Sequence, residues 1–429
     1  MTRKLPHDLV ILMAGRVVGR VQRDGSKLQF IYDDAWRHSG PGIPLSLSMP
    51  LTEAVHRDDR ITAWMWGLLP DNDRTLQRIG NEHGVSSRNP FGLLWAIGQD
   101  CPGAVQFVEE ARIDEVTQAG DTRWLDEAEI AARLASLRRE ASTGRLPNEG
   151  QFSLPGAQPK TALCLVDGKW GVPSGRTPTT HIFKPPSTDL QGHLQNEHFC
   201  LRLAGKLGLV AAQSQVLKFG DEIAIVVERY DRRQVSGRIL RAHQEDMCQA
   251  MGVHPERKYE FEGGPGIKAI MDILHASTDP VTDRRRFMEA EVFNFLIGGT
   301  DAHGKNYSVL LGRNQVRLAP LYDVASFLPY AERWQSVKMP MKIDKYYLYT
   351  DVQLHHWERL AKSVGFPADE LRETLDRMAH AIPAAAQEVA IAIRTDGVDH
   401  PVLDDLVGRI GDWAEETRKR FRVPVNPRR

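Results

Sequence analysis

The strongest constraint on the fold is a change of sequence pattern near Tyr230. Before it, short apolar runs bounded by glycine and proline are typical of β-strands. After it, longer segments repeat their apolar residues at helical spacing. This change predicts an α+β protein whose first half is rich in strands and whose second half is mostly helical. At 429 residues the chain is long enough for two or three domains.

The strand-rich half is expected to contain two parts. A small N-terminal subdomain, 1–110, begins with a predicted β-meander at Asp8–Tyr32. A second part, 111–230, carries the remaining strands and a polar stretch, Ser142–Gly150, that we expect to be a linker. The helical part, 231–429, then follows.

The expected elements follow from hydrophobic spacing and from glycine and proline boundaries. Helices in the first half are predicted at Ala63–Leu69, Pro90–Gly98, Trp124–Ala141 and Asn196–Leu207. Strands are predicted at Ala162–Val166, His181–Phe183, Val216–Phe219 and Glu222–Val227. The later helices are predicted at Glu245–Met251, Gly266–His275, Arg284–Gly298, Trp357–Val364, Asp369–Ile382 and Leu403–Phe421. A hairpin interrupts them, with strands at Tyr307–Leu311 and Gln315–Leu318.

Charge and composition exclude several classes of function. The 55 Lys and Arg residues balance the 56 Asp and Glu residues, so the chain lacks the broad positive field of non-specific nucleic-acid binding. The longest apolar run near the start, Leu9–Ala14, is too short for a membrane span or a signal peptide, and we expect a cytoplasmic protein. The four cysteines form no C-x-x-C pair, which argues for reduced, mostly buried thiols.

The segment Thr300–Asn306 carries the most chemical information. It lies between an expected helix and the expected hairpin, and Asp323 follows 17 residues beyond Asn306. An Asp, an Asn five residues later and an Asp past a hairpin have the order and spacing of a kinase catalytic loop and its metal-binding Asp. Phosphoryl transfer needs a carboxylate for the proton of the attacking hydroxyl and oxygen ligands for magnesium. We therefore predict Asp301 as the base and Asn306 and Asp323 as magnesium ligands.

Three earlier segments fit either a nucleotide site or a structural role. Lys184 ends an apolar strand before the helix that carries Glu197, as a phosphate-binding lysine does in kinases, whereas a solvated strand end is the alternative. Ser153–Lys160 is a turn with one glycine and no Walker A pattern, so a structural turn is the simpler interpretation. Glu228–Arg233 fits an adenine-binding hinge or a loop of salt bridges.

Taken together, the motifs of the chain resemble the HipA kinases, which are toxins of bacterial toxin–antitoxin pairs. The resemblance covers the whole chain and rests on Pro44–Pro50, Gly67–Pro70, Gly156–Leu163, Thr177–Lys184, Glu228–Arg233, Gln244–Gln249, Gly263–Gly266, Thr300–Asn306 and Leu321–Asp323. It implies a two-lobed fold distantly similar to protein kinases, with the N-terminal subdomain packed on the β-rich lobe. It also implies ATP and Mg²⁺ as cofactors.

The resemblance gives roles to individual residues. Asp301 is the implied proton acceptor, Asn306 and Asp323 hold magnesium, and Ser153 is a site of autophosphorylation. The implied ATP-binding residues are Pro155, Gly156, Ala157, Gln158, Pro159, Lys160, Lys184, Glu228, Arg229, Tyr230, His303, Gly304, Lys305, Asn306, Tyr322 and Asp323. Pro155 departs from the small residue that is usual there, and it removes a backbone donor from the phosphate loop.

The resemblance also implies partners. A small DNA-binding antitoxin of the HipB type is expected, so that DNA is contacted only through it, and the best-known target class is aminoacyl-tRNA synthetase, especially the glutamyl enzyme. Two other functions stay open at this point. A kinase-shaped corepressor with vestigial catalysis is disfavoured by the intact Asp301, Asn306, Asp323 and Lys184, whereas a small-molecule or lipid kinase is compatible with the same residues.

Overall fold

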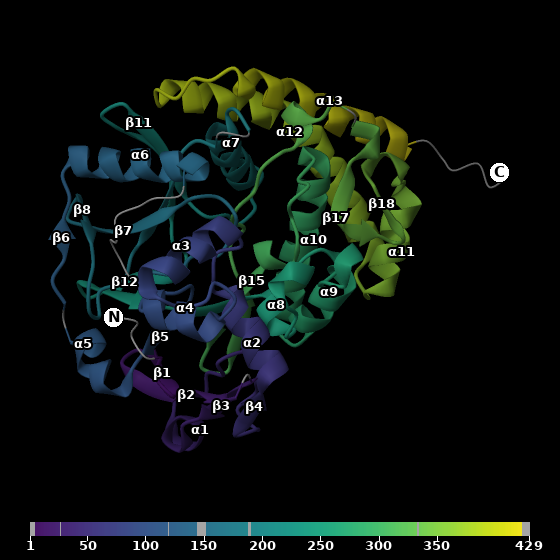
Figure 1. The fold of residues 1–429 in the computed structure, drawn as a ribbon. Coiled ribbons are helices and arrows are strands. Elements are labelled where there is room, and N and C mark those ends of the chain that lie inside the picture. Colours follow the sequence, from purple (N-terminus) through teal and green to yellow (C-terminus); the bar gives the residue numbers. More distant parts are fainter. Residues whose placement is uncertain are drawn as a thin grey trace. The chain divides into compact units, whose positions relative to one another are not determined.

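The computed structural model of the chain describes residues 5–25, 27–118, 120–143, 152–187, 190–332 and 334–422. Contacts divide the chain into two compact units, and Figure 1 gives the element labels used below. Unit 1 comprises Met1–Thr188, Leu217–Lys258 and Ser308–Val316, and unit 2 comprises Asp189–Val216, Tyr259–Tyr307 and Arg317–Arg429. Of the expected linker, residues 144–150 lie outside the described residues.

The N-terminal sheet of unit 1 is antiparallel, with the strand order β4-β3-β2-β1-β5. Its strands are β1 (Asp8–Met13), β2 (Arg16–Asp24), β3 (Lys27–Tyr32), β4 (Val55–Arg57) and β5 (Val105–Val108). The helices of this region are α1 (Asp34–Ser39), α2 (Asp58–Gly67), α3 (Asp73–His83) and α4 (Pro90–Ile97). The meander predicted for β1 to β3 is confirmed.

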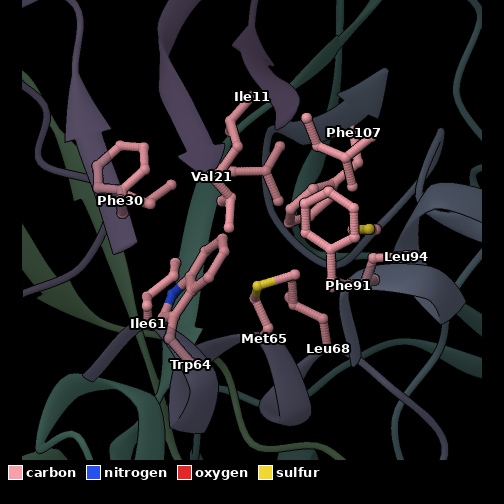
Figure 2. Packing of buried hydrophobic residues seen from close by; sticks show 14 of the residues in the cluster. Ile11, Val21, Phe30, Ile61, Trp64, Met65, Leu68, Phe91, Leu94 and Phe107 are labelled. Atoms are coloured by element: carbon pink, nitrogen blue, oxygen red, sulfur yellow. The ribbon is translucent and has the colours of Figure 1, made fainter. Parts of the chain in front are cut away.

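The hydrophobic core of this region joins the sheet to α2 and α4 (Figure 2). Val21 and Phe107 come from the sheet, Trp64 and Met65 from α2, and Phe91 from α4, and each is fully or almost fully buried. Burying an apolar side chain of this size contributes about 1.5–3 kcal/mol. The core therefore fixes the end of α2, and the predicted phosphate loop contacts Leu68 just beyond it.

The second sheet has the strand order β10-β11-β9-β7-β8-β6. Its strands are β6 (Arg123–Trp124), β7 (Thr161–Val166), β8 (Lys169–Val172), β9 (His181–Lys184), β10 (Ser214–Phe219) and β11 (Glu222–Glu228), and they follow the short α5 (Ile113–Thr117). Helix α6 (Glu127–Thr143) covers this sheet, because its Ile130 and Leu134 pack with Phe183 of β9 and Val226 of β11. The strands predicted between residues 161 and 230 are confirmed.

One predicted helix is partly wrong. Glu245 and Asp246 belong to β14 (His243–Asp246), which joins the predicted hairpin, β15 (Ser308–Gly312) and β16 (Gln315–Leu318), in a three-stranded sheet. Only α8 (Met247–Ala250) is helical, because the side chain of Asp246 accepts a hydrogen bond from the Gln249 N–H and caps the helix there. An unpredicted hairpin precedes it, β12 (Arg232–Val235) and β13 (Arg238–Arg241).

Unit 2 is mostly helical, and the predicted helical character of the C-terminal region is confirmed. Its helices are α7 (His193–Lys206), α9 (Ile267–His275), α10 (Pro280–Ile297), α11 (Leu354–Ser363), α12 (Ala368–Thr395) and α13 (Val402–Arg422). It also holds an unpredicted hairpin, β17 (Lys338–Ile343) and β18 (Tyr346–Leu348). Helix α12 continues past Pro383, because packing on α7 and α13 offsets the roughly 3 kcal/mol that an internal proline costs.

Two expectations from composition can be compared with the structure. All four cysteines are free and buried, as predicted. Among the described residues, no helix has both the length and the apolar content that crossing a membrane requires.

Candidate active site

The loop after α10 presents the predicted catalytic carboxylate. Helix α10 ends at Ile297, and the φ of 66° at the capping residue Gly298 lets the chain turn away from the helix axis. The side chain of Asp301 is 65% exposed. Its Oδ1 accepts a hydrogen bond of 2.8 Å from the hydroxyl of Tyr259 and lies 3.5 Å from Nε2 of the buried His303. The carboxylate is therefore fixed at one oxygen and accessible to solvent.

The two predicted metal ligands lie on adjacent loops. Nδ2 of Asn306 donates a hydrogen bond of 3.2 Å to the backbone carbonyl of Asp323. One residue earlier on each loop, the hydroxyl of Tyr322 donates to the carbonyl of Lys305 at 2.6 Å. Asp323 has a φ of 56°, an uncommon backbone conformation for a residue other than glycine and one that proteins tend to keep at functional sites. The spacing of the sequence predicted this juxtaposition.

The loop that carries Asp323 is held on both sides within unit 2. The backbone of Leu321 pairs with residues 210–212, which follow α7. Its N–H donates to the carbonyl of Val210, and its carbonyl accepts the N–H of Ala212. Three residues beyond Asp323, the backbone of Ser326 exchanges two hydrogen bonds with the side chain of Asn196 on α7, at 2.7 and 2.9 Å. Sequence reasoning missed Asn196, although a buried polar residue at the start of an apolar helix was the available signal.

A small cavity that is open to solvent lies beside these loops in unit 2. Asp301, Asn306 and Asp323 all line it. Its wall also includes His193 of α7 and Asn294 of α10, neither of which the sequence analysis singled out. The three residues predicted from spacing therefore share one cavity.

Buried polar groups on α10 support the catalytic loop. Nδ2 of Asn294 donates to the hydroxyl of Tyr307 at 2.8 Å, and its carbonyl accepts the N–H of Gly299. Glu291 lies one turn earlier, and burial raises its pKa to about 8 although a hydrogen bond with Tyr307 acts in the opposite direction. Asn294 thus contacts residues on both sides of the loop that carries Asp301. In the sequence, polar residues spaced three apart within an apolar helix could have indicated Glu291 and Asn294.

Lys184, which was predicted to bind phosphate, is the last residue of β9 in unit 1. It pairs with Ile225 of β11 and is only 5% exposed. The alternative of a solvated strand end is therefore wrong, since burying a lysine requires compensating polar partners. Close by in the same unit, the side-chain amide of Gln158 donates to the carbonyl of Pro185 at 3.4 Å.

The predicted phosphate loop is folded onto the end of α2. Ser153 is fully buried, and its hydroxyl donates a hydrogen bond of 2.7 Å to the carbonyl of Leu68. Gly156 has a φ of 105°, a conformation that favours glycine, and its carbonyl accepts the N–H of Asp71. The ammonium of Lys160 donates to the carbonyl of Pro155 at 2.6 Å. The loop therefore makes hydrogen bonds within itself and with the N-terminal subdomain.

The predicted adenine hinge contains a buried ion network. Arg229 donates to Asp231 and to Asp100, and Arg232 also forms ion pairs with both carboxylates. The guanidinium groups of Arg229 and Arg232 are each 2% exposed. The backbone N–H of Arg229 donates to the carbonyl of Thr180. The salt-bridge interpretation is thus confirmed for these side chains, and the carbonyl of Arg229 accepts the backbone N–H of Arg232 at 3.1 Å.

Family models match both parts of the chain. The HipA N-terminal domain matches residues 9–108, and the HipA-like C-terminal domain matches residues 152–386. A chain of the Shewanella oneidensis MR-1 structure of HipA, HipB and operator DNA has a TM-score of 0.82 and 26% identity, covering 96% of this chain and 97% of that one. Fold and site thus define a two-lobed, kinase-like α+β protein, with a β-rich N-terminal subdomain and a mostly helical C-terminal lobe.

Curated relatives agree along nearly the whole length. Y4mE of Sinorhizobium fredii is 36% identical over 410 residues, which cover 92% of this chain and 96% of that protein. The serine/threonine-protein kinase toxin HipA of Shewanella oneidensis is 30% identical over 396 residues, which cover 88% of each chain. The chain belongs to the HipA family of kinases.

Proposed function

We propose that this protein is an ATP-dependent serine/threonine kinase that transfers the γ-phosphate to a hydroxyl of another protein. The cavity in which Asp301, Asn306 and Asp323 meet is the observation that carries this proposal. Asp301 accepts the proton of the attacking hydroxyl, because its carboxylate is exposed and is held in place by Tyr259. The two neighbouring loops supply the oxygen atoms that a phosphate-bound cation requires.

The site fits Mg²⁺ bound together with ATP. The Asp323 carboxylate and the Asn306 amide oxygen are the hard oxygen donors that Mg²⁺ takes beside phosphate and water. Because Asn306 donates its amide nitrogen to the carbonyl of Asp323, the orientation of its amide is fixed. No cluster of three or more His, Cys, Asp or Glu side chains suited to a metal occurs in the described ranges. A cation that shares its ligands with ATP needs no such cluster, and it supplies charge neutralisation at the phosphates.

The other proposed ATP contacts follow the family resemblance. In unit 2 they are His303, Gly304, Lys305 and Tyr322, beside the two metal ligands. In unit 1 they are Lys184 for the phosphates, Pro155–Lys160 as the phosphate loop and Glu228–Tyr230 for adenine. Their support is the family resemblance, together with the buried position of Lys184.

Autophosphorylation of Ser153 is proposed as part of the same activity. Its hydroxyl is fully buried against Leu68, so the segment must leave this position before the hydroxyl can accept a phosphoryl group. A phosphate carries close to two negative charges and cannot return to a buried place without cationic partners. Phosphorylation would therefore keep the loop out of the position seen here.

The proposed biology follows the family. A HipB-like DNA-binding antitoxin is the proposed partner, supported by the Shewanella structure that contains HipA, HipB and operator DNA. We propose contact with DNA only through this antitoxin, a cytoplasmic location, and an aminoacyl-tRNA synthetase, such as the glutamyl enzyme, as the protein substrate.

Incubation of the protein with γ-labelled ATP, Mg²⁺ and a bacterial lysate tests the activity. Wild type should label a lysate protein and its own Ser153, as identified by mass spectrometry. Asp301→Asn should lower the labelling rate by about 10²–10⁴-fold, since an amide cannot accept the hydroxyl proton. Label only in a small molecule would favour a small-molecule kinase. Near wild-type transfer by Asp301→Asn would contradict the assignment of the base.

A further inference from the structure

A tyrosine 42 residues before the catalytic loop contacts the proposed base directly. We propose that Tyr259 is a positioning residue that orients the Asp301 carboxylate for phosphoryl transfer, which rests on the proposed function. The hydroxyl of Tyr259 donates to Oδ1 of Asp301 at 2.8 Å, and Nε2 of His303 lies 3.5 Å from the same oxygen. Both contacts fall on one oxygen, so Oδ2 is left for the acceptor hydroxyl.

The ring of Tyr259 is fixed by two aromatic neighbours. It stacks on Phe261, with ring centroids 5.3 Å apart and an interplanar angle of 16°. It also meets the ring of His303 edge-on, at 5.0 Å and 80°. Such aromatic pairs add stability beyond that of their buried area. The phenol therefore reaches Asp301 from a defined direction.

The backbone of the same segment is folded into a tight turn. The carbonyl of Tyr259 accepts the N–H groups of Glu262 and Gly264, at 3.0 and 2.9 Å. Gly263 between them has a φ of 91°, which favours glycine. The Gly263–Gly266 motif, singled out in the sequence but given no role by the kinase mechanism, thus shapes the turn that carries Tyr259.

A carboxylate anchors this turn to the rest of unit 2. Glu260 accepts the backbone N–H of Lys342 on β17 at 2.7 Å and pairs with the ammonium of Lys342 at 3.1 Å. Gly266 caps α9 beside Glu260, and a Cβ at this glycine would overlap the Glu260 carboxylate. The turn is therefore held by β17 on one side and by the start of α9 on the other.

The anchored turn indicates that Tyr259 orients the Asp301 carboxylate and does not block the place of the acceptor hydroxyl. A phenol that occupied the place of the acceptor hydroxyl would have to leave before each turnover, and the turn around Tyr259 is fixed by the contacts of Glu260 and Gly263. A base works best when its proton-accepting oxygen is held within hydrogen-bond reach of the acceptor. Holding Oδ1 of Asp301 achieves this without occupying Oδ2.

Tyr259→Phe tests the hydrogen bond, because it keeps the ring and removes only the hydroxyl. We expect kcat for transfer to the labelled lysate protein to fall about tenfold, the scale of one hydrogen bond to a charged group, with KM for ATP within about twofold of wild type. Tyr347→Phe is the matched control, since Tyr347 contacts Phe261 edge-on and has no hydrogen bond to Asp301. Its kcat should stay at the wild-type value.

A double variant gives a second, independent readout. If Tyr259 acts only through the Asp301 carboxylate, adding Tyr259→Phe to Asp301→Asn should lower the rate by less than about twofold further. Unchanged or faster turnover of Tyr259→Phe overturns the proposal, and faster turnover would indicate a blocking tyrosine. An equal loss in Tyr347→Phe would also overturn it. If wild type itself transfers no phosphate, the proposed kinase function fails instead.

Discussion

At the scale of single residues, Asp323 combines a proposed metal ligand with an unusual backbone conformation. Its φ of 56° is tolerated by Asn about as well as by Asp, so Asp323→Asn removes the charge without adding backbone strain. We expect this variant to bind ATP at least tenfold more weakly than wild type in the presence of Mg²⁺. Isothermal titration calorimetry with Mg²⁺ and then with EDTA provides the comparison.

The EDTA arm is the control for that prediction. Wild type should lose affinity for ATP when Mg²⁺ is removed, whereas Asp323→Asn should bind equally weakly in both conditions. An Asp323→Asn protein that keeps the full effect of Mg²⁺ would place the cation elsewhere. Asp323→Ala is a poorer test, because alanine disfavours a positive φ and would add strain to the loss of the ligand.

The site residues that could be predicted are those with local spacing. Asp301, Asn306 and Asp323 lie within one loop–hairpin–loop, so the order of the chain already implies that they meet. Tyr259 and Asn196 could not be predicted in this way. Each reaches the site from a distant segment, by 42 residues to Asp301 and by 130 to Ser326, and only tertiary packing sets such contacts.

At the scale of elements, the ion network joins β12, β13 and the loop between β11 and β12 to the segment after α4. Although burial alone would raise it, the pKa of Asp100 is held well below its usual range by Arg232, Arg241 and Arg229. A depressed pKa means that the stability this carboxylate contributes is present above the unfolded pKa of about 3.9. It is lost only as the pH falls towards the lower folded value.

Asp100→Asn should therefore destabilise unit 1 by about 3–5 kcal/mol, because it leaves buried arginines without their counter-charge. Urea unfolding followed by tryptophan fluorescence measures this loss, which should be the same from about pH 5 to pH 8, where the wild-type carboxylate stays ionised. Glu110→Gln, at an exposed ion pair with Arg20, is the control and should unfold as wild type does. A pH-dependent loss would contradict the assigned charge state.

Elements with strong periodicity were predictable, and elements set by pairing were not. Helices α9 to α13 carry apolar residues at helical spacing, so their existence was clear from the sequence. The hairpin β12–β13 has exposed apolar and charged residues in no regular alternation. The sequence of β14 is compatible with the start of a helix, and it is a strand because it pairs with β15. Pro383 suggested that the helix ends at Ile382, but α12 continues to Thr395 because it packs on α13.

At the scale of the whole molecule, the two units differ in which of the predicted site residues they hold. Unit 2 holds Asp301, Asn306 and Asp323 around one cavity. Unit 1 holds Lys184 at the end of β9 and the phosphate loop folded onto α2. If Lys184 binds phosphate as proposed, its substitution should alter ligand binding as well as the stability of unit 1.

Lys184→Ala tests the proposed phosphate-binding role of Lys184 through ligand-dependent stability. A ligand present at about 100 times its Kd stabilises the native state by about 2.7 kcal/mol, so Mg-ATP should raise the melting temperature of wild type. We expect Lys184→Ala to lose most of this increase, because a cation aimed at phosphate contributes mainly to binding. The comparison is the difference in melting temperature with and without Mg-ATP, which removes any direct effect of the substitution on folding. Lys169→Ala, at an exposed lysine on β8 of the same sheet, should keep the full increase. An undiminished increase in Lys184→Ala would mean that the nucleotide binds without this lysine, and no increase in wild type would contradict ATP binding itself.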